Sequence, residues 1–116
     1  MPVKPKIALY WCSSCGGCDE SVIDLSEDLL ALSMGVDIVF WPLAMDGRRK
    51  DLEALSDGEI DLSLINGAIR MHEQAHMVKL LRRKSKLVFA HGTCAHLGGI
   101  VGLGNFHSVQ IGRAHV

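Results

Sequence analysis

The feature that most constrains the fold of this chain is a regular alternation of strand-like and helix-like segments. Short apolar runs rich in strand-forming residues occur at 6–11, 36–41, 61–65 and 86–90. Helical patterns fill the intervals at 20–34, 51–55 and 71–84. Strands that alternate with helices predict a parallel sheet with helices on both faces. We therefore expect an α/β fold, a flavodoxin-like or Rossmann-like layer, and we expect the glycine-rich chain from His91 onward to be irregular.

The composition limits the classes of function. The chain has 116 residues, 48% of them hydrophobic, and a net charge of −1, which indicates one globular domain and argues against a nucleic-acid-binding protein. No apolar run is long enough to span a membrane, and the N-terminus lacks the pattern of a secretory signal. We therefore expect a cytoplasmic protein without a membrane span.

Three of the four cysteines lie within seven residues, in the stretch YWCSSCGGCDES at 10–21. Cys12, Cys15 and Cys18 directly follow the first predicted strand, and Cys94 follows the fourth. In a parallel sheet both loops emerge at the carboxyl edge, where such folds bind ligands. If the strand order is 2-1-3-4, these strands are two positions apart, about 10 Å. The four thiols can therefore meet although they are distant in sequence.

Several kinds of chemistry compete for these thiols. A thiol–disulfide oxidoreductase would use the W-C-x-x-C motif of Cys12 and Cys15, but the motif comes early for that fold and leaves the other two cysteines without a role. A zinc-stabilised binding module would use Cys15, Cys18, Cys94 and His96, without a second paired motif. Buried structural thiols are a third alternative. An iron–sulfur cluster fits better, because glycines beside the cysteines let backbone N–H groups approach the sulfides.

The two cysteine motifs together resemble a known family. The stretches CGGCDES at 15–21 and GTCAHLGGIVGL at 92–103 resemble the small subunit of [NiFe] hydrogenases and the related 20 kDa subunit of NADH:ubiquinone oxidoreductase. FWPLAMD at 40–46 and NGAIR at 66–70 are similar to segments of the cytoplasmic, methyl-viologen-reducing type. The resemblance covers roughly residues 5–107.

This resemblance implies a flavodoxin-like domain that holds a proximal [4Fe-4S] cluster against a large catalytic subunit, with further electron-transfer subunits as partners. Two of the family's ligands fall on Cys15 and Cys18, and a third falls on Cys94. The fourth lies in a later G-C-P motif that this sequence does not contain, so Cys12 is a possible replacement. Glu20 matches an acidic family position that could pass protons or tune the cluster, although a carboxylate at a helix start is the simpler interpretation.

Two further segments need an interpretation. HEQAH at 72–76 matches the H-E-x-x-H motif of zinc peptidases, but no third ligand follows, and we predict a solvated helix face. The last six residues, IGRAHV at 111–116, match a translated sequencing adapter. We therefore expect a truncated gene product with an iron–sulfur domain over 1–110 and a non-native tail over 111–116.

Overall fold

The computed structural model describes residues 4–43 and 49–106, so the predicted tail at 111–116 lies outside the described residues. Four parallel strands form one sheet in the order β2-β1-β3-β4, the order on which the expected meeting of the cysteine loops depends. The strands are β1 (Lys6–Trp11), β2 (Asp37–Phe40), β3 (Ile60–Asn66) and β4 (Ser85–His91). Each lies within one residue of its predicted bounds at either end.

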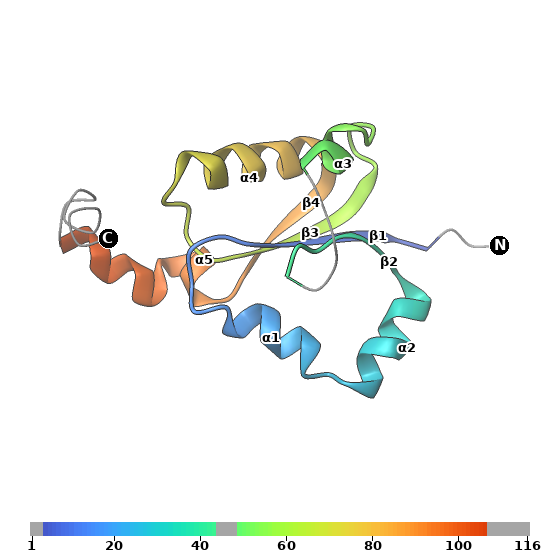
Figure 1. Cartoon of the computed structure of the whole chain (residues 1–116), viewed down its shortest axis with the longest axis horizontal. Coiled ribbons are helices and arrows are strands. Elements are labelled where there is room, and N and C mark those ends of the chain that lie inside the picture. Colours follow the sequence, from blue (N-terminus) through green and yellow to red (C-terminus); the bar gives the residue numbers. More distant parts are fainter. Residues whose placement is uncertain (1–3, 44–48, 107–116) are drawn as a thin grey trace.

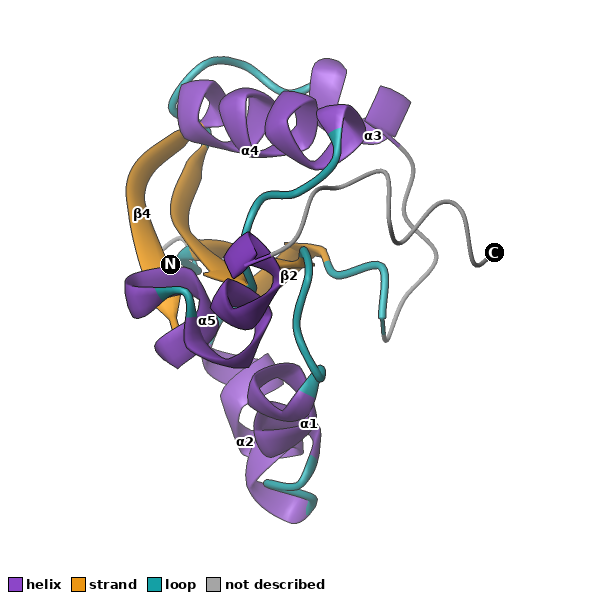
Figure 2. Cartoon of the chain, turned by 90° about the vertical axis from the view of Figure 1, so that its left-hand side faces the viewer, coloured by secondary structure: helices purple, strands orange, loops and turns teal. Residues whose placement is uncertain are grey.

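Helices cover both faces of the sheet, as predicted. They are α1 (Gly17–Ile23), α2 (Glu27–Gly35), α3 (Arg49–Glu53), α4 (His72–Lys84), α5 (Thr93–Leu97) and the 3-10 helix η1 (Gly99–Phe106). Figure 1 shows α3 and α4 on one face and α1 and α2 on the other, and the turned view of Figure 2 shows the same two layers. Across the described ranges, no helix combines the length and the apolar character that a bilayer crossing requires.

The hydrophobic core lies between the sheet and α4. Leu80 and Leu81 are almost fully buried, because the apolar side of α4 faces the strands. They pack in one cluster with Ala8 of β1, Ile60 of β3 and Leu52 of α3. The opposite layer is looser, since α2 buries none of its residues.

The single helix predicted over 20–34 is wrong in one respect, because the chain forms two helices there. The break falls at Ser26, whose backbone has φ 52°. Glu27 and Asp28 then occupy the first turn of α2, where negative charge suits the free N–H groups of a helix start. A serine followed by two acidic residues is a helix-start pattern, and the continuous apolar stripe obscured it.

The segment after His91 was also predicted incorrectly, because it is helical rather than irregular. Residues 93–97 form α5 and residues 99–106 form η1. Gly98 separates the two with a left-handed backbone conformation, a conformation that glycine adopts without steric cost. Gly92 and Gly98 therefore mark the two ends of α5, while the other glycines of this segment lie within η1.

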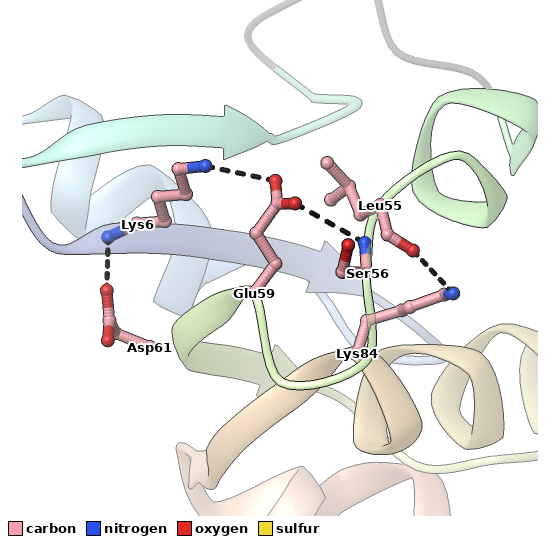
Figure 3. Close-up of polar contacts among 6 residues, drawn as sticks. All are labelled: Lys6, Leu55, Ser56, Glu59, Asp61 and Lys84. Carbon is pink, nitrogen blue, oxygen red and sulfur yellow. Dashed lines mark hydrogen bonds and ion pairs between the residues drawn. The ribbon is translucent and has the colours of Figure 1, made fainter.

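Charged side chains connect the elements at the amino edge of the sheet, the edge where its strands begin (Figure 3). The Lys6 backbone N–H donates to Asp61 at 2.8 Å, and the Lys6 Nζ donates to Glu59 at 3.0 Å. Lys84, at the end of α4, donates to the Leu55 carbonyl at 2.6 Å and to Asp57 at 3.2 Å. These bonds connect the starts of β1 and β3 and the end of α4.

Candidate functional site

Three loops meet at the carboxyl edge of the sheet, where β1, β3 and β4 end. The Cys12 N–H donates to the Asn66 carbonyl at 2.7 Å. One residue later, Ser13 and Ala68 exchange two backbone hydrogen bonds of 3.0 and 2.9 Å as an antiparallel bridge. Asn66 is in turn the register partner of His91 in β4. The loop that carries Cys12, Cys15 and Cys18 is therefore joined directly to the end of β3 and, through β3, to the end of β4.

Gly67 makes this close approach possible. Its φ is +95°, and a Cβ placed there would lie 2.8 Å from the Ser13 nitrogen and 2.9 Å from the Ser13 oxygen. Real Cβ atoms do not approach backbone atoms so closely, and side chains rarely adopt this φ. Glycine is therefore required at 67 for the bridge to form.

The two cysteine-bearing loops also contact one another. The Cys18 Sγ lies against the Gly92 backbone, where the absence of a side chain leaves room for it. Gly92 is two residues before Cys94, which lies in the first turn of α5. The predicted convergence of the loops after β1 and β4 is thus present at Cys18 and Gly92.

The four cysteines occupy different environments, and all are free thiols. Cys15 is exposed and its Sγ accepts the Gly17 N–H at 3.4 Å, while Cys18 and Cys94 are partly buried. Cys12 is 7% exposed and packs in the hydrophobic core. Burial raises the pKa of the Cys12 thiol to about 11. Cys12 is therefore harder to deprotonate than an ordinary cysteine, and the thiolate is the reactive form of the side chain.

The thiols do not converge on a single point. Within residues 4–43 and 49–106, no three Cys, His, Asp or Glu side chains are grouped closely enough to hold one metal ion. This arrangement gives no support to the single-ion zinc site of Cys15, Cys18, Cys94 and His96. A cluster makes a different demand, because each cysteine binds a separate iron atom and the sulfurs stay apart.

Backbone contacts shape the turn around Cys15. The Trp11 indole Nε1 donates to the Ser14 carbonyl at 3.3 Å, and the Gly16 N–H donates to the Ser14 Oγ at 3.1 Å. The same hydroxyl donates to the Asn66 Oδ1 at 3.2 Å. Ser14 thus holds the turn that presents Cys15 and also ties it to the end of β3.

A buried polar cluster, which the sequence did not indicate, lies at this edge. It consists of the buried Asp19, Trp41 and Asn66 and the partly buried His91. The Trp41 Nε1 donates to the Asp19 Oδ2 at 3.4 Å, while the Asp19 Oδ1, the Asn66 Nδ2 and the His91 Nδ1 have no partner among the described residues. Asp19 is fully buried, and burial raises its pKa, an effect that the Trp41 hydrogen bond, the nearby His91 and the Asn66 side chain oppose. Buried polar atoms without a partner are uncommon in folded proteins, and a redox or catalytic role is one of the explanations for them.

Three other candidates from the sequence are exposed. Glu20 lies on the outer side of α1, as expected for a helix-start carboxylate. His72 and His76 are both exposed on α4, which confirms the predicted solvated face. The residue of HEQAH that points inward is Gln74, which is 7% exposed. Its burial could have been anticipated only from the helical phase set by Met77 and Leu81.

Comparison with known proteins assigns the family. The family described as NADH ubiquinone oxidoreductase, 20 Kd subunit, matches residues 15–116. The chain belongs to this family. Among its curated relatives is the iron-sulfur subunit of the F420-non-reducing hydrogenase of Archaeoglobus profundus, which is 48% identical over 88% of this chain and 32% of the relative. The corresponding vhu subunit of the F420-non-reducing hydrogenase of Methanococcus voltae is 37% identical over 95% of this chain and 36% of its own length.

A solved structure supports the same assignment. A chain in the crystal structure of the NAD+-reducing [NiFe]-hydrogenase in the H2-reduced state superposes with a TM-score of 0.80 and 28% identity, over 94% of this chain and 57% of that chain. These findings confirm the resemblance seen in the cysteine motifs and the α/β fold. The chain spans about a third of the length of the curated relatives described above, 32% and 36%.

Proposed function

We propose that this chain is an electron-transfer subunit that binds an iron–sulfur cluster through Cys15, Cys18 and Cys94. The observation that carries the proposal is the contact of the Cys18 Sγ with Gly92, two residues before Cys94. It supports a site built from both cysteine loops at the ligand-binding edge of a parallel sheet. The iron-sulfur relative at 48% identity supports the same cofactor class.

The residues of the chain supply the surroundings that such a cofactor needs. When bound, a cluster takes up and releases one electron at a time. The exposed Cys15 and the partly buried Cys18 and Cys94 are the thiols available as ligands. The Gly17 N–H already points at the Cys15 Sγ, and N–H donors to cysteine sulfur stabilise the reduced, more negative state.

The finer assignment is a [4Fe-4S] cluster in a cytoplasmic [NiFe]-hydrogenase-like or respiratory oxidoreductase complex. The catalytic centre then belongs to a large partner subunit, and this chain passes single electrons between that centre and further electron-transfer subunits. The names of the similar proteins, which are hydrogenase subunits and a [NiFe]-hydrogenase, support this assignment. Three thiols are assigned here, and Cys12 is left out because it packs in the core.

Replacement of single cysteines tests the proposal. The full chain is purified without oxygen, loaded with iron and sulfide, and assayed for iron, acid-labile sulfide and the electron paramagnetic resonance of the reduced state. We expect Cys15→Ser, Cys18→Ser and Cys94→Ser each to lose most of the bound iron, because each removes a thiolate ligand.

Cys12→Ser is the matched control, since it makes the same chemical change in the same loop. We expect it to keep the iron content and spectrum of the unaltered chain. Full iron content in Cys94→Ser would contradict the assignment, as would loss of iron in Cys12→Ser from a chain that is still folded. Insulin-type disulfide reduction by the metal-free chain would favour the oxidoreductase alternative instead.

A further inference from the structure

Gln74 is a buried polar residue in α4, a helix that contributes no thiol to the site. Its side chain is 7% exposed, and its Oε1 is the acceptor of three hydrogen bonds. The donors are the Ser13 Oγ at 3.1 Å, the Arg70 N–H at 2.9 Å and the Met71 N–H at 3.2 Å. One amide oxygen therefore joins the cysteine loop, the segment after β3 and the start of α4.

The segment after β3, residues 67–71, lies between the two groups of thiols. On one side Gly67 lies against the backbone of Cys12 and Ser13, and Ala68 bridges to Ser13. On the other side Gly67 and Ala68 line an open pocket of about 460 Å³ together with Cys94. This segment therefore lies between the backbone of Cys12 and Ser13 and the pocket that Cys94 lines.

We propose that Gln74 is a positioning residue that sets the separation between the Cys15–Cys18 loop and Cys94. It does so by holding the 67–71 segment and Ser13 on a single oxygen atom. The consequence of this positioning is that the ligands keep the spacing that the cluster requires, and this part of the inference rests on the proposed function. The structural part of the inference concerns hydrogen bonds among the protein's own residues, which can be measured without the cluster.

The side chain at position 74 must be a hydrogen-bond acceptor. A methionine at 74 keeps the length of the side chain but leaves the Ser13 hydroxyl and two backbone N–H groups without this oxygen. Buried donors without a partner are costly, so the contacts should open. A glutamate keeps an acceptor at the third position of the helix, where negative charge is favourable. Gln74→Glu should therefore preserve the arrangement that Gln74→Met destroys.

The first arm of the test is hydrogen exchange in the metal-free full chain. The reporters are the Ser13 and Ala68 N–H groups, which bond to one another's carbonyls. We expect Gln74→Met to speed their exchange about tenfold or more and Gln74→Glu to stay within about threefold of the unaltered chain. His72→Gln, an exposed change in the same helix, is the control and should have no effect.

The second arm follows iron release from the loaded chain to a chelator, together with the resonance spectrum of the reduced state. We expect release about tenfold faster and an altered spectrum in Gln74→Met, with both restored in Gln74→Glu. If Gln74→Met exchanges or releases iron like His72→Gln, the proposal is overturned. If the unaltered chain takes up no iron, the proposed function fails, while the exchange arm still decides whether Gln74 holds the loops.

Discussion

The amino and carboxyl edges of the sheet differ in how their carboxyl groups are paired and in the direction in which the pKa values of those groups are shifted. At the amino edge, Glu59 and Asp61 bond to Lys6, whose donated hydrogen bonds are the main cause that lowers the pKa of each carboxyl. At the carboxyl edge, Asp19 is fully buried with one oxygen unpartnered among the described residues, and burial raises its pKa. Ion pairs connect the strands at one edge, whereas at the other edge some buried polar atoms have no partner in the part of the chain that the structure describes.

This contrast indicates that the amino edge contributes to stability and the carboxyl edge to the functional site. Paired charged groups lower the free energy of the folded state, whereas buried polar groups without a partner raise it. The cysteine loops lie at the second kind of edge. Changes at the amino edge should therefore alter stability alone, while changes at the carboxyl edge should alter the site.

The largest effect that would sharpen the comparison is expected from Lys84→Met. Its Nζ is the charged donor to the Leu55 carbonyl and to Asp57, and its side chain is 9% exposed. Loss of these bonds should lower the free energy of unfolding by about 1–3 kcal/mol, measured by urea denaturation. Iron binding per folded chain should not change. A loss of iron in chains that remain folded would break the separation between the two edges.

A smaller change of opposite sign is expected from Asp19→Asn in the metal-free chain. The folded-state pKa of Asp19 is raised, so its ionisation opposes folding at neutral pH. The neutral asparagine removes that penalty and keeps an acceptor for Trp41. The variant should be more stable than the unaltered chain at pH 7, by less than the Lys84 change, and the difference should shrink as the pH falls through the raised pKa. A less stable variant at pH 7 would show that the carboxylate is compensated.

The smallest effect concerns acid denaturation at the amino edge. The folded-state pKa values of Glu59 and Asp61 are lowered, so both carboxylates stabilise the fold above their unfolded pKa values, about 4.3 and 3.9. That contribution is lost as the pH falls through the folded-state values. In Lys6→Met the loss of stability between about pH 5 and pH 3 should be shallower, because Glu59 no longer has the charged Nζ as its partner. An equal slope in both chains would remove Lys6 from the explanation.

Much of the fold followed from apolar patterns that report directly on packing. The run KIALYW at 6–11 is a strand because its central residues, such as Ala8, face the core. The break at 24–26 was not predicted, because apolar residues continue across it and the positive φ of Ser26 is not visible in their pattern. A change of backbone conformation at a single residue is not visible in the pattern of hydrophobic residues.

The site was predicted less completely than the fold. The meeting of the loops after β1 and β4 followed from topology, and the structure shows it at Cys18 and Gly92. The burial of Cys12 did not follow from its spacing, because the motif gives no information on which way the first side chain points. The inward Gln74 was concealed within a motif that drew attention to its histidine neighbours. Side-chain direction is a tertiary property, so spacing alone does not determine it.

Gly67 has a consequence for how this protein tolerates sequence change. It offers no charge, no donor beyond its backbone and no ligand atom, yet the two backbone segments that meet at Ser13 touch where its side chain would be. The absence of a side chain at Gly67 lets the loop that carries the cysteines approach the end of β3. Tolerance to substitution should therefore be lowest at a position with no reactive chemistry of its own, and a survey that scored only functional groups would pass over it.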